Sequence, residues 1–284
     1  MAVESGSRSQ GGGLRARVLT ASALAPLVMI AVLTLPTVWF GALMAVFIGL
    51  AAWEWAGLAG FDTAAVRAAY GGVVLGCLFL VWGAAPRTLD PFLLAMAALW
   101  WLVLSVRLAL VRQVDAAPAR EPSLLLLGLL VLVAPWLALL HLHGLPTDGP
   151  FLALSLLLLI WMADTAAYFA GRRFGRAKLS PLLSPGKTRV GVYAGVAAAA
   201  VWGGVVALVL GLTPAKVLIV MLISTAAAVM SVTGDLFESL LKRRRGIKDA
   251  GSLLPGHGGM LDRIDSATAA APIFALGLIW LVGN

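Results

Sequence analysis

The stretch "SLLLLGLLVLVAPWLALL", residues 123–140, contains no charged side chain. An α-helix needs about 20 mostly apolar residues to cross the hydrocarbon core of a bilayer, whereas a buried strand is usually only about four to eight residues long. This stretch therefore predicts a membrane-spanning helix.

The rest of the chain has the same character. Of its 284 residues, 61% are hydrophobic and 12% are charged, whereas a soluble domain averages about half apolar and about a quarter charged. We therefore expect an all-α, polytopic integral membrane protein with little room for a soluble domain. Apolar runs bounded by proline, glycine and charged residues indicate nine spans. They cover residues 18–36, 38–58, 70–84, 91–111, 123–140, 150–170, 190–212, 214–231 and 266–282.

The distribution of Lys and Arg indicates which side of the membrane each loop occupies, because short cytoplasmic loops carry an excess of positive charge. With a cytoplasmic N-terminus, 19 of the 21 basic residues fall in cytoplasmic segments, and only Arg87 and Lys216 fall outside them. Residues 1–17 are then a disordered cytoplasmic tail; a cleaved signal peptide is the alternative, although the apolar run that follows is long enough to span. The net charge of +8 follows from this orientation and indicates no nucleic-acid partner.

Few ionisable residues lie within or beside the apolar runs, and each is a candidate site residue because charge is costly in a membrane. Asp262 and Asp265 precede the last run, three residues apart, and Asp235 and Glu238 have the same spacing at the end of the eighth. Residues three apart share a helix face. Neighbouring carboxylates repel unless a cation lies between them, and their hard oxygens favour Mg²⁺ or Mn²⁺ over Zn²⁺. Alternatively, Asp262 and Asp265 only complement the positive end of a helix.

Two predicted cytoplasmic loops are rich in basic residues, "KRRRGIK" at 242–248 and "GRRFGRAKLSPLLSPGKTR" at 171–189. A divalent cation together with Lys and Arg is what a polyphosphate requires, because its charge must be neutralised. Glycines in "SPGKT" (184–188) and "PGHGG" (255–259) would let backbone N–H groups approach phosphate oxygens. The alternative for the basic residues is membrane orientation and attraction to anionic lipid alone.

The stretch "SLLKRRRGIKDAGSLLPGHGGMLDRID", residues 239–265, resembles the signature of the phosphatidate cytidylyltransferase family, also called CDP-diacylglycerol synthases. Its Ser, Lys-Arg, Lys-Asp, Pro-x-His-Gly-Gly and Asp-Arg-x-Asp positions all match. The segment "DTAAYFAGRRFGRAKLSPLLSPGKT" at 164–188 and the early "EWAGL" at 54–58 are also similar to the family, so the likeness covers most of the chain. One position departs from the pattern: the family usually has Glu before Gly191, and this chain has Val190.

The resemblance implies that the chain converts CTP and phosphatidate into CDP-diacylglycerol and pyrophosphate for phospholipid biosynthesis. Mg²⁺ is the implied cofactor, with one cation or two in the site. The implied location is the bacterial plasma (inner) membrane with the active site facing the cytoplasm. The partners are CTP, phosphatidate and membrane lipid, and a homodimer is a possible assembly.

We expect two parts after the tail. Residues 18–149 form the N-terminal group of about five spans, and residues 150–284 form a C-terminal catalytic region of about four spans. The cytoplasmic loops of the catalytic region are expected at 171–190 and 235–265.

The resemblance assigns metal binding to Asp235, Asp262 and Asp265, which agrees with the spacing of these carboxylates. It makes the basic residues of both loops candidates for holding the phosphates of CTP and of the lipid. They are Arg172, Lys178, Lys187, Lys242, Arg243, Lys248 and Arg263, of which Lys187, Lys248 and Arg263 are also assigned to catalysis together with the three aspartates. Further substrate contacts are expected from Asp164, Ser184, Thr188, Asp249, His257, Gly258 and Gly259.

Three other functions are left open. A CTP-dependent lipid-alcohol kinase would use a similar nucleotide and metal, but it would transfer the γ-phosphoryl group and release CDP. A transporter of organophosphates would also need basic residues, although it would place them near the middle of the membrane rather than in loops. The departure at Val190 leaves room for a catalytically silent, lipid-binding homologue.

Overall fold

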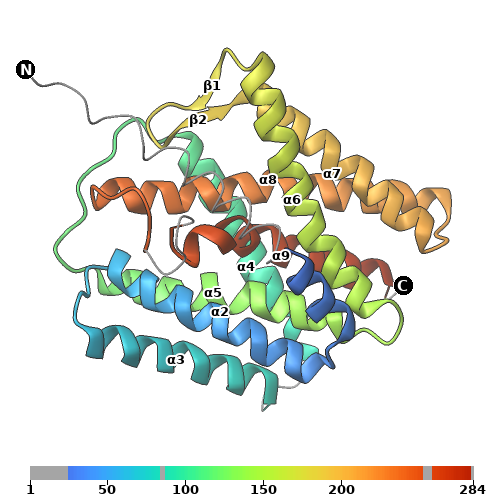
Figure 1. The fold of residues 1–284 in the computed structure, drawn as a ribbon, viewed down its shortest axis with the longest axis horizontal. Helices are drawn as coiled ribbons and strands as arrows, with labels where there is room; N and C mark the ends of the chain where they lie inside the picture. The colour runs from blue at the N-terminus through green and yellow to red at the C-terminus, as the bar shows by residue number, and fades with distance from the viewer. Residues whose placement is uncertain (1–24, 84–86, 252–257, 283–284) are drawn as a thin grey trace, which may run out of the picture.

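The computed structural model describes residues 25–83, 87–251 and 258–282, which are almost entirely helical (Figure 1). A short apolar helix, Ala25–Thr34, precedes the labelled elements. The labelled helices are α2 Thr37–Leu58, α3 Ala64–Gly83, the 3₁₀ turn η1 Arg87–Leu89, α4 Asp90–Ala109, α5 Pro122–His143, α6 Gly149–Phe174, α7 Arg189–Val209, α8 Pro214–Arg244 and α9 Leu261–Val282. The two strands are β1 Lys178–Ser180 and β2 Ser184–Thr188.

Within the described parts of the chain, eight helices are long and apolar enough to cross a membrane. The expectation of an all-α, polytopic membrane protein is therefore confirmed. The first predicted span, residues 18–36, is described only from Ala25 onward, where it is helical over Ala25–Thr34. The predicted tail, residues 1–17, lies outside the described residues, and the side on which the N-terminus lies stays a prediction.

The eighth predicted span is wrong at its end, because α8 does not stop at residue 231 but continues as one helix to Arg244. The charged residues that suggested a loop, Asp235, Glu238 and Lys242, follow one another at spacings of three and four and so line one face of the helix. α9 likewise begins at Leu261, earlier than the predicted residue 266. Both ends of the predicted loop 235–265 are therefore helical. Charged side chains can lie on these helices because residues of α8 pair with residues of α9, as Lys242 does with Asp262.

The predicted loop 171–190 contains structure that its sequence did not suggest. α6 extends to Phe174, and the residues after it form an antiparallel hairpin in which Lys178 pairs with Thr188 and Ser180 with Ser184. The hydroxyl oxygen of Thr188 accepts a hydrogen bond of 3.1 Å from the backbone N–H of Gly191 and so caps the N-terminus of α7. Lys187 is thereby held next to Thr188, the N-cap residue of α7.

Figure 1 shows α8 and α9 in the middle of the molecule, with α6, α7 and the hairpin on one side and α2, α3 and α5 on the other. α9 packs against α8, α5 and α4, and its apolar side chains, such as Phe274 and Leu278, are buried. α3 is the least buried of the spans. α9 therefore lies among other helices, and its first turns carry Asp262 and Asp265.

α6 and α7 approach each other closely because both present small residues at their contact. A Cβ added at Gly191 would lie 2.7 Å from the backbone oxygen of Ala167, and one at Gly195 would lie 2.8 Å from that of Ala163. Small residues four apart are the pattern that lets membrane helices pack at short distance. This contact sets the positions of two helices that line a cavity together with α8 and the hairpin.

We expect Gly195→Ala to destabilise the protein, because the new methyl group would meet a backbone carbonyl that cannot rotate away. Overpacking of this kind costs about 1–3 kcal/mol, and the midpoint of thermal unfolding in detergent, followed by tryptophan fluorescence, should fall. Gly76→Ala in α3 is the matched control, since a Cβ there meets no atom within 4 Å. An unchanged midpoint for Gly195→Ala would contradict the close α6–α7 contact.

Candidate active site

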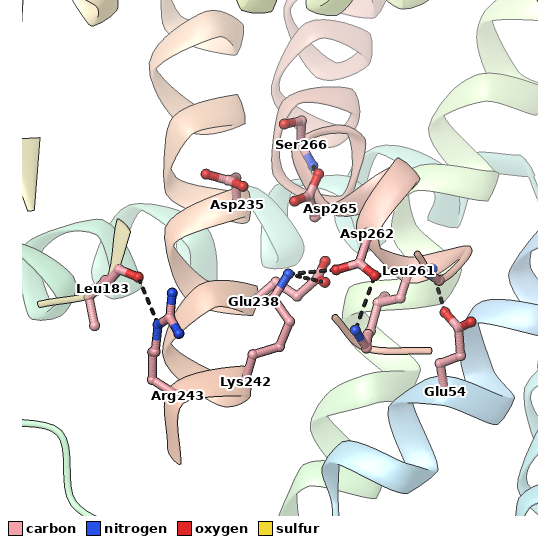
Figure 2. A network of polar contacts seen from close by, with 12 residues as sticks. Glu54, Leu183, Asp235, Glu238, Lys242, Arg243, Leu261, Asp262, Asp265 and Ser266 are labelled. Carbon is pink, nitrogen blue, oxygen red and sulfur yellow. Dashed lines mark hydrogen bonds and ion pairs between the residues drawn. The ribbon is translucent and has the colours of Figure 1, made fainter. Parts of the chain in front are cut away.

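α8 and α9 run antiparallel and present acidic residues to each other at the same spacing. Asp235 and Glu238 lie on α8, and Asp265 and Asp262 lie on α9. The carboxyl groups of Asp235 and Asp265 are within hydrogen-bonding reach of each other, as are those of Glu238 and Asp262. The spacing seen in the sequence therefore produces two pairs of facing carboxylates, which lie about one helical turn apart (Figure 2).

Lys242 joins the two members of the Glu238–Asp262 pair. Its ammonium nitrogen lies 3.0 Å from Glu238 Oε1 and 2.6 Å from Asp262 Oδ1 (Figure 2). The other oxygen of Asp262 accepts hydrogen bonds from the backbone N–H groups of Gly259, at 2.8 Å, and Ala250, at 3.0 Å. Glu238 is only 3% exposed, and a carboxylate so deeply buried needs a paired cation. Lys242 supplies that charge.

Lys187, from β2, forms an ion pair with Asp235. Asp164 on α6 is close enough to interact electrostatically with both Lys187 and Asp235. Asp265 interacts with the same lysine, and its Oδ1 accepts a hydrogen bond of 2.5 Å from the backbone N–H of Ser266. The hairpin thus brings one ammonium group to carboxylates from α6, α8 and α9.

Acidic groups outnumber lysines in this connected set. The acidic residues are Asp164, Asp235, Glu238, Asp262 and Asp265, and the lysines are Lys187 and Lys242. Carboxylates crowded together in a low dielectric are stabilised by further cations or by shared protons. Their hard oxygens suit Mg²⁺, which typically takes one or two carboxylates and completes its shell with water and substrate phosphates.

The carboxylates available to such a cation are arranged in pairs. In the described part of the chain, no three His, Cys, Asp or Glu side chains come together closely enough to hold a metal ion unaided. The predicted ligands are accordingly divided, with Asp235 and Asp265 together and Asp262 beside Glu238. A divalent ion at either pair would take its remaining ligands from water or from substrate phosphates.

A cavity of about 570 Å³ lies beside Lys187, between α6, α7, α8 and the hairpin. A volume of this size is typical of small-molecule sites. Five residues predicted to contact substrate line it, namely Asp164, Arg172, Lys178, Lys187 and Thr188. The rest of the wall is mostly small or apolar and includes Gly191, Val192, Gly195, Val196, Ala228 and Val232. The cavity therefore has a basic end near the hairpin and an apolar side between the spans.

Two predicted substrate residues lie at the contact between α8 and the hairpin instead of in the cavity wall. Ser184 begins β2, opposite Ser180. Arg243 donates from Nε to the backbone oxygen of Leu183, at 3.5 Å (Figure 2). Arg243 thus holds the hairpin against α8, and Ser184 forms part of the strand pairing of that hairpin.

The remaining predicted residues lie near the start of α9. Gly259 donates to Asp262, and Gly258, with a φ of 81°, lies beside the same carboxylate. The positive φ is readily adopted only by glycine. Three further predicted residues are exposed: Lys248, Asp249 and Arg263. His257 lies outside the described residues, so its role stays a prediction.

Two acidic residues at this site were not assigned from the sequence. Glu238 had detectable signals, since it lies three residues after Asp235 and four before Lys242. Glu54 on α2 accepts a hydrogen bond of 2.7 Å from the backbone N–H of Leu261, 207 positions further along the chain. No local pattern connects residues so far apart; the signals were a charge within an apolar span and the likeness of "EWAGL" at 54–58 to the family.

The consecutive cations at the end of α8 have different roles. Lys242 faces the carboxylates, whereas Arg244 forms an ion pair of 3.2 Å with Glu121. Arg245 donates from Nε to the backbone oxygen of Leu58 at 2.7 Å. The arginines at 244 and 245 therefore hold the end of α8 to neighbouring segments rather than facing the cavity.

A polytopic helical protein with facing carboxylate pairs beside a cation-rimmed cavity has the features of a membrane-embedded enzyme for phosphorylated substrates. The sequence model of the cytidylyltransferase family matches residues 15–280, and the chain belongs to this family. It is 37% identical over 270 residues to the phosphatidate cytidylyltransferase of Pseudomonas aeruginosa, an alignment that covers 95% of this chain and 98% of that protein. The protein of the same name from Haemophilus influenzae is 34% identical over 284 residues, covering 92% of this chain and 97% of its own length. The resemblance noted at residues 239–265 is therefore confirmed.

Replacing Lys242 by Met should lower the free energy of unfolding by about 3 kcal/mol, because Glu238 and Asp262 would then face each other without their cation. The measurement is unfolding in mixed micelles of increasing sodium dodecyl sulfate content. Lys216→Met, near the start of the same helix, is the control; its ammonium group donates to the backbone oxygen of Leu281 at 3.5 Å, and loss of this hydrogen bond is expected to cost about 1 kcal/mol or less. Equal losses in the two variants would show that the pairing of Lys242 with the carboxylates is not stabilising.

Proposed function

We propose that this protein is a phosphatidate cytidylyltransferase, which transfers the cytidylyl group of CTP to phosphatidate and releases pyrophosphate. The observation that carries the proposal is the pairing of acidic residues across α8 and α9 next to a cavity with a basic end and an apolar side. Relatives of that name align with nearly the whole chain.

The chemistry suits these residues. A phosphate oxygen of phosphatidate attacks the α-phosphorus of CTP, and the bond from that phosphorus to the oxygen bridging the β-phosphorus breaks. The nucleophile is already an anion, so the reaction needs no strong general base. The site must instead bring two anions together and stabilise the charge of the transition state. Arg172, Lys178 and Lys187 around the cavity can hold the phosphates in position.

Mg²⁺ is the cofactor that we propose for the carboxylate pairs. Asp235 and Asp265 would hold one ion, and Asp262 with Glu238 would hold a second if two are used. When bound, Mg²⁺ supplies positive charge to the phosphates and the pyrophosphate leaving group. Lys187 and Lys242 already contact these pairs, so both lysines lie where they can also bind phosphate oxygens.

The lipid would enter from the membrane. The cavity wall on the α7 and α8 sides is made of small and apolar residues such as Val192, Val196 and Val232. Large apolar side chains on the outer faces of α6 and α7, among them Phe169 and Tyr193, are exposed, as expected for helices that contact lipid. We propose that the acyl chains lie along this side while the phosphate lies at the basic end.

The proposed location of the site is the cytoplasmic face of the bacterial inner membrane. The hairpin, the end of α8 and the end of α2 are connected through Arg243 and Arg245 and so lie at one end of the molecule. That end gathers most of the basic residues, whereas the turn between α5 and α6, residues 144–148, has none. Short loops rich in Lys and Arg are cytoplasmic. A homodimer stays a prediction, to be decided by light scattering in detergent.

The activity can be tested with purified protein in detergent, dioleoyl phosphatidate and CTP labelled at the α-phosphorus, with and without Mg²⁺. The label should pass into the lipid only when Mg²⁺ is present. Unlabelled lipid with accumulation of labelled CDP would indicate a lipid kinase instead, and the absence of any turnover would favour a transporter or a scaffold.

In the same assay, Asp265→Asn should lower the rate at least about a hundredfold, because loss of even an indirect metal partner typically costs about 10–100-fold. Asp148→Asn is the matched control, since Asp148 is exposed in the turn before α6. Full activity of Asp265→Asn would remove Asp265 from the proposed metal site.

The orientation can be tested by labelling cysteines in intact cells. The natural Cys77 is first replaced by Ser, and a new cysteine is placed either at Thr147, between α5 and α6, or at Ala177, before β1; both positions are exposed. A membrane-impermeant maleimide should label Thr147→Cys in intact cells but Ala177→Cys only after permeabilisation. The reverse pattern would place the site on the outer face.

A further inference from the structure

The N-terminus of α9 is capped by a side chain from a distant helix. The first backbone N–H groups of any helix have no partner within the helix, and a nearby Ser, Thr, Asp or Asn usually supplies one. Here Glu54 Oε2 accepts from the backbone N–H of Leu261 at 2.7 Å (Figure 2), and the backbone N–H of Met260 donates to the same carboxylate. Glu54 is only 2% exposed. A carboxylate in this position also interacts favourably with the positive end of the helix dipole.

The described ends of the segment that connects α8 to α9 come close to this carboxylate at Gly251 and Gly259. A Cβ added at Gly259 would come within 2.5 Å of Glu54 Oε2, and one at Gly251 would collide with Oε1. Both glycines are therefore required for backbone to approach Glu54. The two described ends of the connecting segment thus meet at one buried side chain.

The same end of α2 also holds the beginning of that segment. Arg245 donates from Nε to the backbone oxygen of Leu58, one turn after Glu54, at 2.7 Å. A second guanidinium nitrogen of Arg245 donates to the backbone oxygen of Pro118 at 2.6 Å. The last two turns of α2 therefore fix where the chain leaves α8 and where it enters α9.

Asp262 is the residue whose position depends most directly on this anchor. It follows Leu261, and its Oδ2 accepts from Gly259 and Ala250, which belong to the segment packed around Glu54. Its Oδ1 contacts Lys242. A shift of the first turn of α9 would therefore break the alignment of Asp262 with Glu238 and, one turn on, that of Asp265 with Asp235.

We propose that Glu54 is a positioning residue, which holds the first turn of α9 in the register that brings its two aspartates opposite the acidic residues of α8. The proposal concerns the structure of this chain, and it rests on the proposed function only for the effect on turnover. Glu54 does not line the cavity described above, so we infer that it acts through Leu261 and Asp262.

Two substitutions separate the reach of the side chain from its charge. Glu54→Gln keeps the length and one oxygen acceptor but loses the charge, whereas Glu54→Asp keeps the charge but is one methylene too short. Asp90→Ala is the control for loss of a buried carboxylate, because Asp90 is 1% exposed at the start of α4, at the opposite end from Arg245 and the hairpin. Thermal unfolding midpoints show whether the variants are equally stable.

The first readout needs no turnover. Backbone amide hydrogen exchange, followed by mass spectrometry on peptides that contain residues 258–264, should be at least about tenfold faster in Glu54→Asp than in the wild type, since the capping hydrogen bond protects these amides. It should change less than about threefold in Glu54→Gln and in Asp90→Ala. Unchanged exchange in Glu54→Asp would overturn the proposal, whether or not the protein proves to be a cytidylyltransferase.

The second readout is kinetic. In Glu54→Asp, kcat/KM should fall and the Mg²⁺ concentration for half-maximal rate should rise, each by about 10–100-fold, as is typical when a residue that orients a metal ligand is changed. Glu54→Gln should recover most of both values, and Asp90→Ala should leave the Mg²⁺ requirement unchanged. A lower rate with an unchanged Mg²⁺ requirement would contradict the positioning role and would show that Glu54 only stabilises the fold. An inactive wild type would contradict the proposed function but leave the exchange result decisive for Glu54.

Discussion

Four carboxylates face one another across α8 and α9, and the protein must keep them there in a largely apolar interior. Charges removed from water are costly unless they are paired and hydrogen-bonded. Lys242 and Lys187 meet part of this requirement, and backbone N–H groups of Gly259 and Ser266 meet more of it. The antiparallel register of the two helices places all of these cations and N–H groups beside the carboxylates at the same time.

The other elements can be understood as supports for that register. The hairpin brings Lys187 to Asp235, and its end at Thr188 is fixed by the start of α7. α6 is held against α7 by contacts between glycines and backbone oxygens, which places Asp164 near the same lysine. On the other side, α2 holds the start of α9. The segments before residue 150 therefore contribute to the geometry of a site whose chemistry lies almost entirely after it.

The basic residues are divided between two physical tasks. Those that line the cavity, Arg172, Lys178 and Lys187, lie where a phosphate could replace water. Arg244 and Arg245 instead satisfy a carboxylate and backbone oxygens of neighbouring segments. Since a run of cations looks uniform in the sequence, composition alone could not separate the two tasks.

Membrane class, span positions and the acidic spacing on α8 and α9 were predictable, because they follow from local apolarity and helix periodicity. The end of α8 was not, since the charges of Asp235 and Glu238 suggest a loop until their partners on α9 are known. The hairpin was also missed, because its strands are short and their pairing depends on neighbouring helices. Glu54 shows the same limit most clearly, as its partner lies in a segment that only tertiary packing brings near.

The length of α8 determines the depth at which the carboxylates lie. Asp235 lies about 32 Å along the helix from Pro214, at about 1.5 Å per residue, and the hydrocarbon core is about 30 Å thick. A helix that enters the membrane at Pro214 and crosses it without strong tilt would carry the pairs to the level of the phospholipid headgroups, at the boundary between hydrocarbon and water. A phospholipid can present its phosphate there without extraction from the leaflet, which would cost about 0.8 kcal/mol for every methylene exposed. A water-soluble nucleotide can reach the same plane without entering the membrane.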